Sequence, residues 1–563
     1  MELNFFKKNL YFCKKLKANM FTNFSDLPNY PNLFLDYLYE FDRVKDFYNL
    51  NFRNSEEFLG KFNEIKDSKR ISKEDLSRII RNQYKDISCS KRTLSNINLL
   101  SSDKTMAVVT GQQLTIFSGP LYTFYKIITE IKLCTKLKEA YVDFNFVPVF
   151  WMEGDDHDFE EVNSINIYNK ENILTTINYL NTDDEPFESG SVGNLVFDDK
   201  IESSIENLKQ NLRDSDFKDE LISLLKKHYF KGNAFKSSFK GLLMHFFDEF
   251  GLIIFDPQDI EYKKLLIPIF ENELQDYELH TKIILKRSAQ LEENYHAQVK
   301  VKPINLFYSE NNKRFLIEPD ENGYRLKNKR KKFSKEEILS LLNTNPEFFS
   351  PNVLLRPICQ DYLFPTAFYI GGPGEISYFA QLIPYYAIFK IPQPIIYPRS
   401  SVTLLEKNIK NLIDKYGLSF LSIIQQGEDL FPKILSNNSD INTEDIFHKI
   451  TLQLNDIFSN LENQLIQIDK NLLESIKRTQ EKTMSNFDLL KGKVTNSQLQ
   501  KNEILFRQLK KIITSILPDS ALQERLINFT YYYNKYGNEI ISLLFDKISI
   551  SKFEHQIIEI DIK

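Results

Sequence analysis

The stretch MAVVTGQQLTIFSGPLYTFYK, residues 106–126, has a strand–loop–helix pattern from which the fold can be predicted. It opens with a short apolar run, Met106–Thr110, of the kind found in buried strands, and meets a glycine at Gly111. A helix-like segment, Leu121–Leu137, follows. Three further apolar runs of this kind lie at Phe146–Trp151, Leu252–Phe255 and Pro394–Tyr397. Buried strands that alternate with helices predict an α/β fold with a parallel sheet.

The rest of the chain is arranged around these sheet segments. Two polar stretches separate them, and the second has a hairpin pattern in which Asn305–Tyr308 and Arg314–Ile317 flank a turn. We therefore interpret both stretches as insertions into the sheet domain. The predicted division is N-terminal helices with the first part of the core over 1–165, a first insertion over 166–230, a core segment over 231–261, a second insertion over 262–350, the last part of the core over 351–402 and C-terminal helices over 403–563.

The C-terminal part has few glycines and a helical pattern. Its apolar positions recur at a spacing close to an 11-residue period, which predicts a long, nearly straight helix. These positions are Leu454, Ile457, Leu461, Leu465, Ile468, Leu472 and Ile476. A second helix, Ser497–Ile516, is expected to return antiparallel after Gly492, and a third to cover Ala521–Leu544. So long an apolar stripe needs a helix as its partner, in this chain or in a second copy.

Composition excludes several classes of protein. The 563 residues are 42% hydrophobic and 26% charged, which is typical of a soluble globular protein and not of a disordered chain. With 72 basic and 77 acidic residues the net charge is −5, so we predict no nucleic-acid partner and no membrane partner. The N-terminus has no signal-peptide pattern, and no apolar run is long enough to cross a bilayer. We therefore expect a cytoplasmic protein.

The first segment with chemical potential directly follows the first predicted strand. Open α/β sheets bind ligands at the carboxyl ends of their strands, which favours Thr110, Gln112 and Gln113. Downstream, SGPLYTFYK (118–126) places Pro120 at the first helical position and Gly119 at the cap, so the next free N–H groups would face a phosphate or carboxylate. The alternative is an ordinary strand–loop–helix turn in which glycine serves geometry alone.

The second segment is WMEGDDHDFEE, residues 151–161, which also follows a strand. One histidine lies among six carboxylates here, a cluster that could bind a divalent cation, hold an ammonium group or orient an imidazole for proton transfer. The alternative is a solvated acidic loop, although Trp151 and Phe159 supply apolar anchors. No second histidine lies nearby and the four cysteines form no C-x-x-C pair, so we predict no firm metal site.

Two further segments carry polar groups next to sheet elements. Arg356 precedes the run GGPGEISY (371–378), in which Glu375 either acts in the site or complements the dipole of the following helix. Arg399, in PRSS (398–401), could bind an anion as a bidentate donor, and an exposed salt bridge is the alternative.

Taken together, these segments resemble one family, the bacillithiol biosynthesis cysteine-adding enzymes. The resemblance rests on TGQQ with SGPLYTFYK, on VPVFWMEGDDHDFEEV, and on segments downstream in the same order. These are FGLIIFDPQD, YHAQV with NLF, LLRPICQDYLFPTAFYIGGPGEISYFAQL, YPRSSVTLLE and LQERLINFTYYYNKYG. It extends from about residue 100 to the C-terminus, and several long motifs in a fixed order are far more specific than any single one.

The resemblance implies a fold and an activity. The fold would be a Rossmann-like core similar to class I nucleotidyl transferases and aminoacyl-tRNA synthetases, with two connecting-peptide insertions and a C-terminal helical coiled coil that supports a homodimer. The activity would be that of a ligase that adds L-cysteine to the amine of glucosaminyl malate to give bacillithiol. Amide formation from a free carboxylate is uphill in water, so ATP or another nucleotide is expected to activate the carboxyl group.

Roles for individual residues follow as hypotheses. The helix start Ser118–Tyr122 and Lys126 would bind phosphate or the malate carboxylate, and Gln112 and Gln113 would hold sugar hydroxyls or the cysteine. The acidic loop would hold an ammonium group, with His157 moving a proton. The predicted catalytic residues are Asp155, Asp156, His157 and Asp158, and the predicted substrate-binding residues are Thr110, Gln112, Gln113, Ser118, Gly119, Tyr122, Lys126, Trp151, Gly372, Glu375, Tyr378 and Arg399.

Two other functions remain open at this point. One is a metal-dependent hydrolase or transferase that uses the Asp155–Asp158 loop. The other is a non-catalytic coiled-coil scaffold whose α/β part only binds a nucleotide. The ligase hypothesis itself makes a spatial prediction, namely that the segments near residues 112, 156, 375 and 399 line a single polar cavity.

Overall fold

The computed structural model of the chain describes residues 20–156, 158–179, 190–311, 313–437, 443–465, 468–469, 472–501 and 503–562. The chain divides into two compact units. The first comprises Met1–Leu404, Glu524–Ile558 and Ile562–Lys563, and the second comprises Leu405–Gln523 and Glu559–Asp561.

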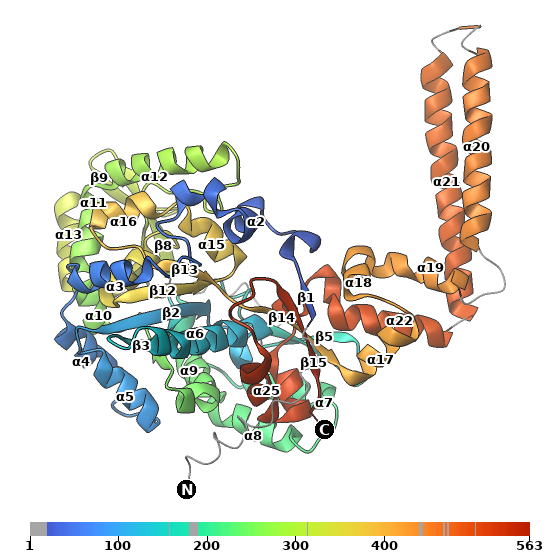
Figure 1. The fold of residues 1–563 in the computed structure, drawn as a ribbon. Helices are drawn as coiled ribbons and strands as arrows, with labels where there is room; N and C mark the ends of the chain where they lie inside the picture. Colours follow the sequence, from blue (N-terminus) through green and yellow to red (C-terminus); the bar gives the residue numbers. More distant parts are fainter. Residues whose placement is uncertain are drawn as a thin grey trace. The chain divides into compact units, whose positions relative to one another are not determined.

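A parallel sheet of five strands lies at the centre of the first unit, in the order β13-β12-β2-β3-β6 among the described residues. The strands are β2 (Thr105–Gln113), β3 (Asn145–Glu153), β6 (Ile253–Phe255), β12 (Thr366–Gly371) and β13 (Ile395–Pro398). Helix α6 (Leu121–Ala140) connects β2 to β3 and packs on both, as Figure 1 shows. The predicted parallel α/β sheet is confirmed.

Burial explains why these runs form the sheet. Residues 105–111 of β2 are buried, as are residues 146–152 of β3, and strands covered on both faces need such continuous apolar runs. Gly111 is required for close approach, because a Cβ there would lie 2.9 Å from the Trp151 carbonyl oxygen. Glycine is also favoured at residue 119, where φ is +71° as the chain turns into α6.

Strand β12 is the element that sequence reasoning missed. Its run TAFYIG lies between β2 and β13, at the centre of the sheet, with every residue buried. A short apolar run has no periodicity that separates a buried strand from a buried helix. Here two largely buried helices, α14 (Arg356–Leu363) and α15 (Pro373–Phe379), flank the strand on both sides.

The first polar stretch forms a two-stranded antiparallel sheet followed by helices. Its elements are β4 (Ser164–Tyr168), β5 (Leu174–Asn178), α7 (Lys200–Asn211) and α8 (Lys218–His228), and α9 (Phe235–Phe247) follows in the predicted core segment. The second stretch forms the antiparallel sheet β10-β9-β8-β7-β11 with helices around it. Its elements are α10 (Ile260–Leu265), α11 (Ile267–Gln275), α12 (Tyr277–Glu292), β7 (Leu306–Glu310), β8 (Lys313–Asp320), β9 (Gly323–Leu326), β10 (Lys332–Ser334), α13 (Lys335–Thr344) and β11 (Phe349–Pro351).

The predicted hairpin in the second stretch is confirmed as β7 and β8, which pair antiparallel. Residue 312 of its turn lies outside the described residues.

The first unit is completed by segments from both ends of the chain. The N-terminal elements are β1 (Met20–Thr22), α2 (Asn32–Tyr39), α3 (Phe58–Asp67), α4 (Lys73–Gln83) and α5 (Lys91–Leu99), and α16 (Ile383–Phe389) precedes β13. The C-terminal elements are α23 (Gln523–Leu526), α24 (Phe529–Tyr536), α25 (Glu539–Lys547) and β15 (His555–Ile560). Strand β1 pairs antiparallel with β15. The single helix predicted over 521–544 is wrong, because Asn528 caps a new helix start and Gly537, at φ +54°, ends that helix.

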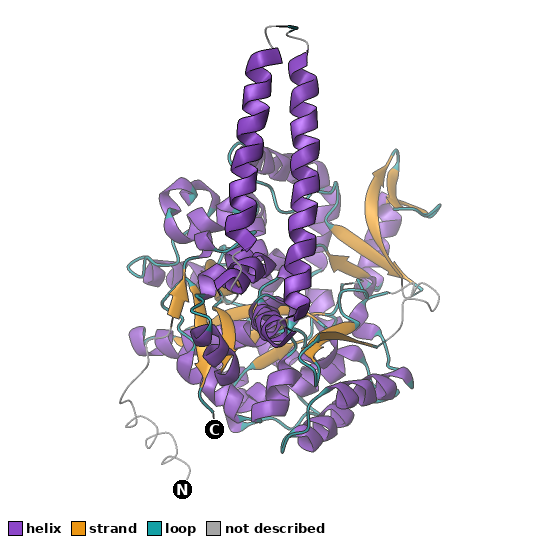
Figure 2. Ribbon diagram, turned by 90° about the vertical axis from the view of Figure 1, so that its right-hand side faces the viewer, coloured by secondary structure: helices purple, strands orange, loops and turns teal. Residues whose placement is uncertain are grey.

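The second unit is almost entirely helical. Its helices are α17 (Lys407–Lys415), α18 (Phe420–Gln426), α19 (Leu430–Asn437), α20 (Thr443–Leu465), α21 (Leu472–Lys501) and α22 (Glu503–Ile516). Strand β14 (Ser401–Glu406) begins in the first unit and ends in the second. Figure 2 shows α20 and α21 side by side as two long helices, and the rings of Phe447 and Phe487 lie 5.0 Å apart between them. Their antiparallel pairing confirms the predicted coiled-coil character of this region.

The position of the reversal differs from the prediction. The apolar spacing runs through residue 465 without a break, yet the chain turns there, with the Ile468 and Asp469 N–H groups donating to the Leu465 carbonyl oxygen. Gly492, where the turn was expected, lies inside α21. The interpretation was wrong because glycine costs only about 1 kcal/mol within a helix. A regular apolar stripe can also continue across a tight turn.

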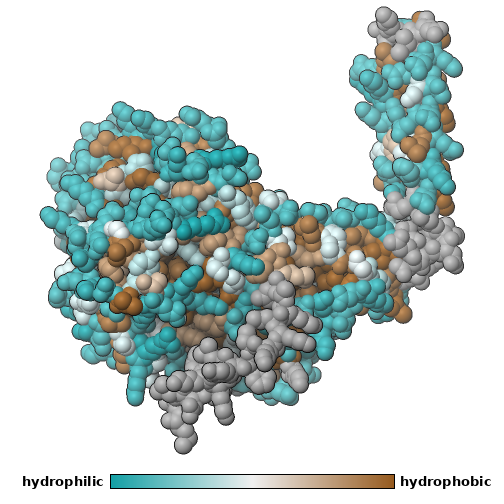
Figure 3. Space-filling model, viewed as in Figure 1, coloured by the Kyte–Doolittle hydropathy of each residue, from teal (hydrophilic) through white to brown (hydrophobic). Residues whose placement is uncertain are grey.

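The exposed surface carries scattered apolar residues. Along α20 and α21 apolar side chains lie among hydrophilic ones (Figure 3), and Ile457 is 59% and Leu489 is 63% exposed. Within the described part of the chain, no helix has the length and apolar character needed to cross a membrane.

Candidate active site

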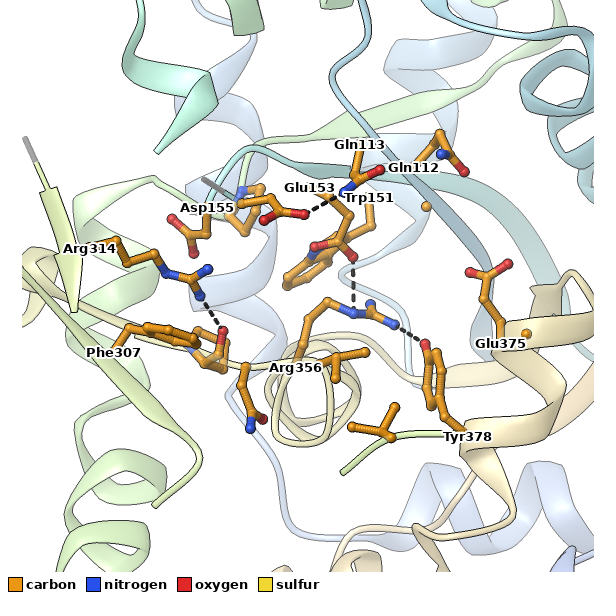
Figure 4. A pocket seen from close by; sticks show the side chains of 18 of the residues that line it. Gln112, Gln113, Trp151, Glu153, Asp155, Phe307, Arg314, Arg356, Glu375 and Tyr378 are labelled. Atoms are coloured by element: carbon orange, nitrogen blue, oxygen red, sulfur yellow. Dashed lines mark hydrogen bonds and ion pairs between the residues drawn. The ribbon is translucent and has the colours of Figure 1, made fainter. Parts of the chain in front are cut away.

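A cavity of about 950 Å³ opens at the carboxyl ends of the central strands, within the first unit. Its wall is formed by the ends of β2 and β3, by the loop before α15 and by residues of the second polar stretch. Its size lies in the range of about 300–1,000 Å³ that is usual for ligand sites. Figure 4 shows polar side chains from these separate segments directed toward one another.

The predicted convergence of the segments near 112, 156, 375 and 399 is confirmed, because all four contribute to this cavity. The predicted residues that line it are Gln112, Gln113, Tyr122, Lys126, Trp151, Asp155, Asp156, Gly372, Glu375, Tyr378 and Arg399.

Five predicted residues are not placed in the cavity wall. Thr110 is buried in the sheet and donates from its hydroxyl to the Ile370 carbonyl oxygen at 2.9 Å. Ser118 is fully buried, and neither it nor Gly119 lines the cavity. Asp158 is exposed and does not line it either, and His157 lies outside the described residues.

The start of α6 differs from the prediction. Pro120 is the cap and Leu121 the first helical residue, so the helix begins one residue later than expected. The first N–H of the predicted anion site is not free, because the Leu121 N–H donates to the Ile527 carbonyl oxygen. The Asn528 side-chain amide also donates to the Gly119 carbonyl oxygen at 2.6 Å. A distant part of the chain therefore covers this helix start.

Lys126 forms a buried ion pair with Glu375. Its ammonium lies 2.6 Å from the Glu375 carboxylate and donates to the Gly111 carbonyl oxygen at 2.8 Å. Burial lowers the pKa of Lys126. Burial alone would raise the pKa of Glu375, but the Lys126 charge and the N–H of Gly372 hold it below its ordinary value. The pair therefore fixes the end of β2 against the loop before α15, and Glu375 largely neutralises the Lys126 charge.

Glu153 and Arg356 form the second pair of the cavity and were not among the predicted site residues. The Arg356 guanidinium lies 3.0 Å from the Glu153 carboxylate and donates to the Tyr378 hydroxyl at 2.8 Å, as Figure 4 shows. Burial raises the pKa of Glu153 to about 7, Arg356 counteracts this, and Asp156 and Asp155 raise it further. With 24% of its side chain exposed, Glu153 is a carboxylate that can exchange a proton near neutral pH.

The acidic loop contributes two more carboxylates. Asp155 pairs with the buried Lys263 of α10 at 2.7 Å. Asp156 accepts a hydrogen bond from the Gln113 side-chain amide, which also donates to Glu161 at 2.8 Å. Among the described residues, no group of three or more His, Cys, Asp and Glu side chains is placed to hold a metal ion.

Two buried polar atoms of the cavity lining have no hydrogen-bond partner among the described residues. They are the indole nitrogen of Trp151 and the hydroxyl of Tyr262. Buried polar groups are nearly always hydrogen-bonded, so both are suited to a ligand.

Arg399 lines the cavity but its charge is already paired. Its guanidinium lies 2.6 Å from Glu524, which is fully buried and also accepts from the Ser401 hydroxyl at 2.9 Å. His555 lies behind this pair, 2.7 Å from the Ser401 hydroxyl and 2.8 Å from that of Thr403. The anion that Arg399 binds is Glu524 of the same chain, whereas the sequence predicted a ligand. The predicted alternative was an exposed salt bridge, and the observed ion pair is buried.

The buried His555 predicts an acid-sensitive fold. Burial lowers its pKa to about 4, so between pH 6.5 and 4 the unfolded chain binds a proton that the folded chain does not. Acidification across this range should therefore lower the free energy of unfolding by about 3 kcal/mol through this residue. Denaturant titrations of the wild type and of His555→Gln at several pH values measure this change in the free energy of unfolding. Identical pH dependences in the two proteins would contradict the prediction.

Sequence reasoning missed Glu153, Arg356, Lys263 and Arg314 as site residues. Glu153 ends a buried strand immediately before the acidic loop, and that position was the signal for it. Arg356 is the first residue of α14 and lies in the segment LLRPICQDYLFPTAFYIGGPGEISYFAQL. Lys263 and Arg314 reach the cavity from the second polar stretch, where no local pattern marks them.

Comparison with known proteins assigns the family. Residues 20–400 match the N-terminal Rossmann-like domain of Bacillithiol biosynthesis BshC, and residues 402–560 match its C-terminal coiled-coil domain. A protein of Salinibacter ruber named "Putative cysteine ligase BshC" is 34% identical over 94% of this chain and 96% of its own length. Proteins of the same name from Chloroherpeton thalassium and Natranaerobius thermophilus are 32% and 31% identical, over 94% and 91% of this chain and 96% and 94% of their own lengths. The chain therefore belongs to the bacillithiol biosynthesis BshC family.

Proposed function

We propose that this protein is a ligase that joins the carboxyl group of L-cysteine to the glucosamine amine of glucosaminyl malate, forming bacillithiol. Family membership over nearly the whole chain supports the reaction class. The observation that carries the proposal is the single cavity in which carboxylates and cations from distant segments meet at the strand ends.

The reaction requires activation of a carboxyl group, and we propose that ATP or another nucleotide provides it. The nucleotide converts the cysteine carboxylate into a form that an amine can attack. The cavity fits such a ligand in size, and the Trp151 indole nitrogen and the Tyr262 hydroxyl offer it two buried polar groups.

The carboxylates of the cavity suit the amines of this reaction. An attacking amine has to lose a proton, and a general base works best when its pKa is close to the working pH. Glu153, with a pKa of about 7, has this property and is exposed to the cavity. We assign it as the proton acceptor. Asp156 would hold the ammonium group of the cysteine, since the charge of Asp155 is already balanced by Lys263.

Neutral polar groups suit the sugar. Gln112 donates to the Tyr122 hydroxyl at 2.9 Å, and Gln113 bonds to Asp156, so both amides are oriented before a ligand binds. We assign Gln112, Gln113 and Tyr122 to sugar hydroxyls. The proton-transfer role of His157 stays a prediction.

The proposed function has a direct test. The purified protein, incubated with cysteine, glucosaminyl malate and ATP, should yield a thiol with the mass of bacillithiol, detected by mass spectrometry. Asp156→Asn and His157→Ala should lower the yield, with the exposed Asp158→Asn as a control for a charge change on the same loop. Absence of product with every nucleoside triphosphate would contradict the function, and wild-type rates in both variants would remove the loop from the site.

We also propose a homodimer formed through the helical region and a cytoplasmic location. Ile457 and Leu489 are largely exposed on the long helices, where a second copy could cover them. The free Cys89, Cys134 and Cys359, and a product that is itself a thiol, suit a reducing compartment. Light scattering of the purified protein measures the oligomeric state.

A further inference from the structure

The cavity contains two kinds of cation, and the difference between them locates an anion site. Four cations each lie within 3.0 Å of a carboxylate of the chain. The pairs are Lys126 with Glu375, Lys263 with Asp155, Arg356 with Glu153 and Arg399 with Glu524. A ligand anion gains little from such cations, because their charge is already balanced.

The other kind has no carboxylate partner among the described residues. Its members all line the cavity, and no described carboxylate lies within 4 Å of any of them: Lys300, Lys302, Arg314, Lys327, Lys329 and Arg525. Five of these six belong to the second polar stretch, and Arg525 does not. We call these five the insertion cations.

Arg314 is the most deeply placed of the insertion cations. Its guanidinium lies 3.9 Å from the centre of the Phe307 ring and donates to the Ser350 hydroxyl at 2.8 Å and to the Pro351 carbonyl oxygen at 2.7 Å. Burial lowers its pKa, and the more distant Asp155 and Asp156 counteract this. Neutral partners thus hold Arg314 in place with its charge uncompensated at short range, and Figure 4 shows it directed toward the cavity.

The lysines come from two segments that meet at the cavity. Lys300 and Lys302 follow α12, and Lys327 and Lys329 lie in the turn between β9 and β10. Asn328, between the latter two, has φ +61°, a left-handed conformation that asparagine tolerates and that tightens this turn. The ammonium of Lys329 lies 5.0 Å from the centre of the Phe315 ring.

We propose that the insertion cations form a polyphosphate subsite that holds the phosphate chain of the activating nucleotide. This inference rests on the proposed function for the identity of its ligand. A triphosphate matches five cations better than the malate dicarboxylate does, because it carries more negative charge. The sequence predicted a phosphate site at the start of α6. There the Leu121 N–H already donates to Ile527 and Lys126 already pairs with Glu375, so we place the phosphates at the insertion cations instead.

The test measures binding, without cysteine or amino sugar present. The full chain is titrated with inorganic tripolyphosphate, and separately with ATP, by calorimetry. In the triple variant Lys302→Gln, Lys327→Gln and Lys329→Gln, both dissociation constants should be about tenfold or more higher than in the wild type at low salt. With added salt, the affinity of the wild type should fall more steeply than that of the triple variant. The control variant Lys282→Gln, Lys286→Gln and Lys335→Gln removes the same charge from exposed positions of the same stretch outside the cavity and should bind as the wild type does.

Several results would overturn the subsite. These are equal dissociation constants in the triple variant and the wild type, failure of the wild type to bind tripolyphosphate, or a triple variant that loses affinity for L-malate but not for tripolyphosphate. Arg314→Lys is a second probe, which keeps the charge but loses the planar donor pair and should weaken tripolyphosphate binding less than Arg314→Gln does. Because no product is measured, the subsite and the ligase reaction can fail separately.

Discussion

Replacing Glu153 by glutamine is expected to slow amide formation by roughly 10²–10⁴-fold, the usual contribution of a general base. The substitution keeps the shape of the side chain and an oxygen that Arg356 can still contact. It removes only the ability to accept a proton. Steady-state rates of thiol formation, measured by mass spectrometry at saturating cysteine and amino sugar, give the effect.

The pH dependence separates this role from a structural one. The base acts when it is deprotonated, so the wild-type rate should rise with pH through about 7, the pKa of Glu153. Glu153→Gln should lack this rise, while any rise that comes from ionisation of the amine substrate is retained. Glu160→Gln, an equivalent change at an exposed position of the same loop, is the control. A Glu153→Gln profile that follows the wild type with only a lower amplitude would reject the assignment.

Replacing Glu524 by alanine is expected to lower the free energy of unfolding by about 3–5 kcal/mol, because breaking a buried ion pair leaves one charge uncompensated. Glu524 is fully buried, and Arg399 is only 8% exposed. The substitution would also remove the acceptor of the Val402 N–H, which donates to the second carboxylate oxygen at 2.8 Å. Denaturant unfolding at neutral pH measures the change.

An exposed pair supplies the matched control. Lys231 and Asp199 lie 2.8 Å apart with side chains that are 62% and 76% exposed, and Asp199→Ala should lower the free energy of unfolding far less than Glu524→Ala does. Equal costs for Glu524→Ala and Asp199→Ala would show that the Arg399–Glu524 pair contributes no more than a surface contact. Acid should weaken the buried pair as well, because the pKa of Glu524 lies below its ordinary value and the pair is lost only when pH falls through it.

The central sheet was predictable to the extent that its segments are local patterns. Continuous apolar runs mark β2, β3, β6 and β13, since a strand buried on both faces needs apolar side chains throughout. Strand β12 was missed because a short apolar run has no periodicity that separates a buried strand from a buried helix. The turn after Leu465 was missed for a related reason, since helical spacing carries no information about where a chain reverses.

Local sequence patterns were enough to predict which polar groups lie at the strand ends. Gln112, Gln113, Asp155 and Asp156 reach one cavity because parallel strands share a carboxyl edge, so a residue that follows a buried strand has its position fixed by local structure.

Which charges of that cavity are available to a ligand depends on contacts that form when the chain folds. In the sequence Lys126 and Arg399 are candidates for anion binding, but Glu375 and Glu524 neutralise them from 249 and 125 positions further along the chain. Lys263 and Arg314 enter from a separate stretch of sequence. Ion pairing depends on the distance between two charges in space. In this cavity, charged groups that no sequence period connects come to within about 3 Å of one another. The charge balance of the site is therefore set only when the chain is folded.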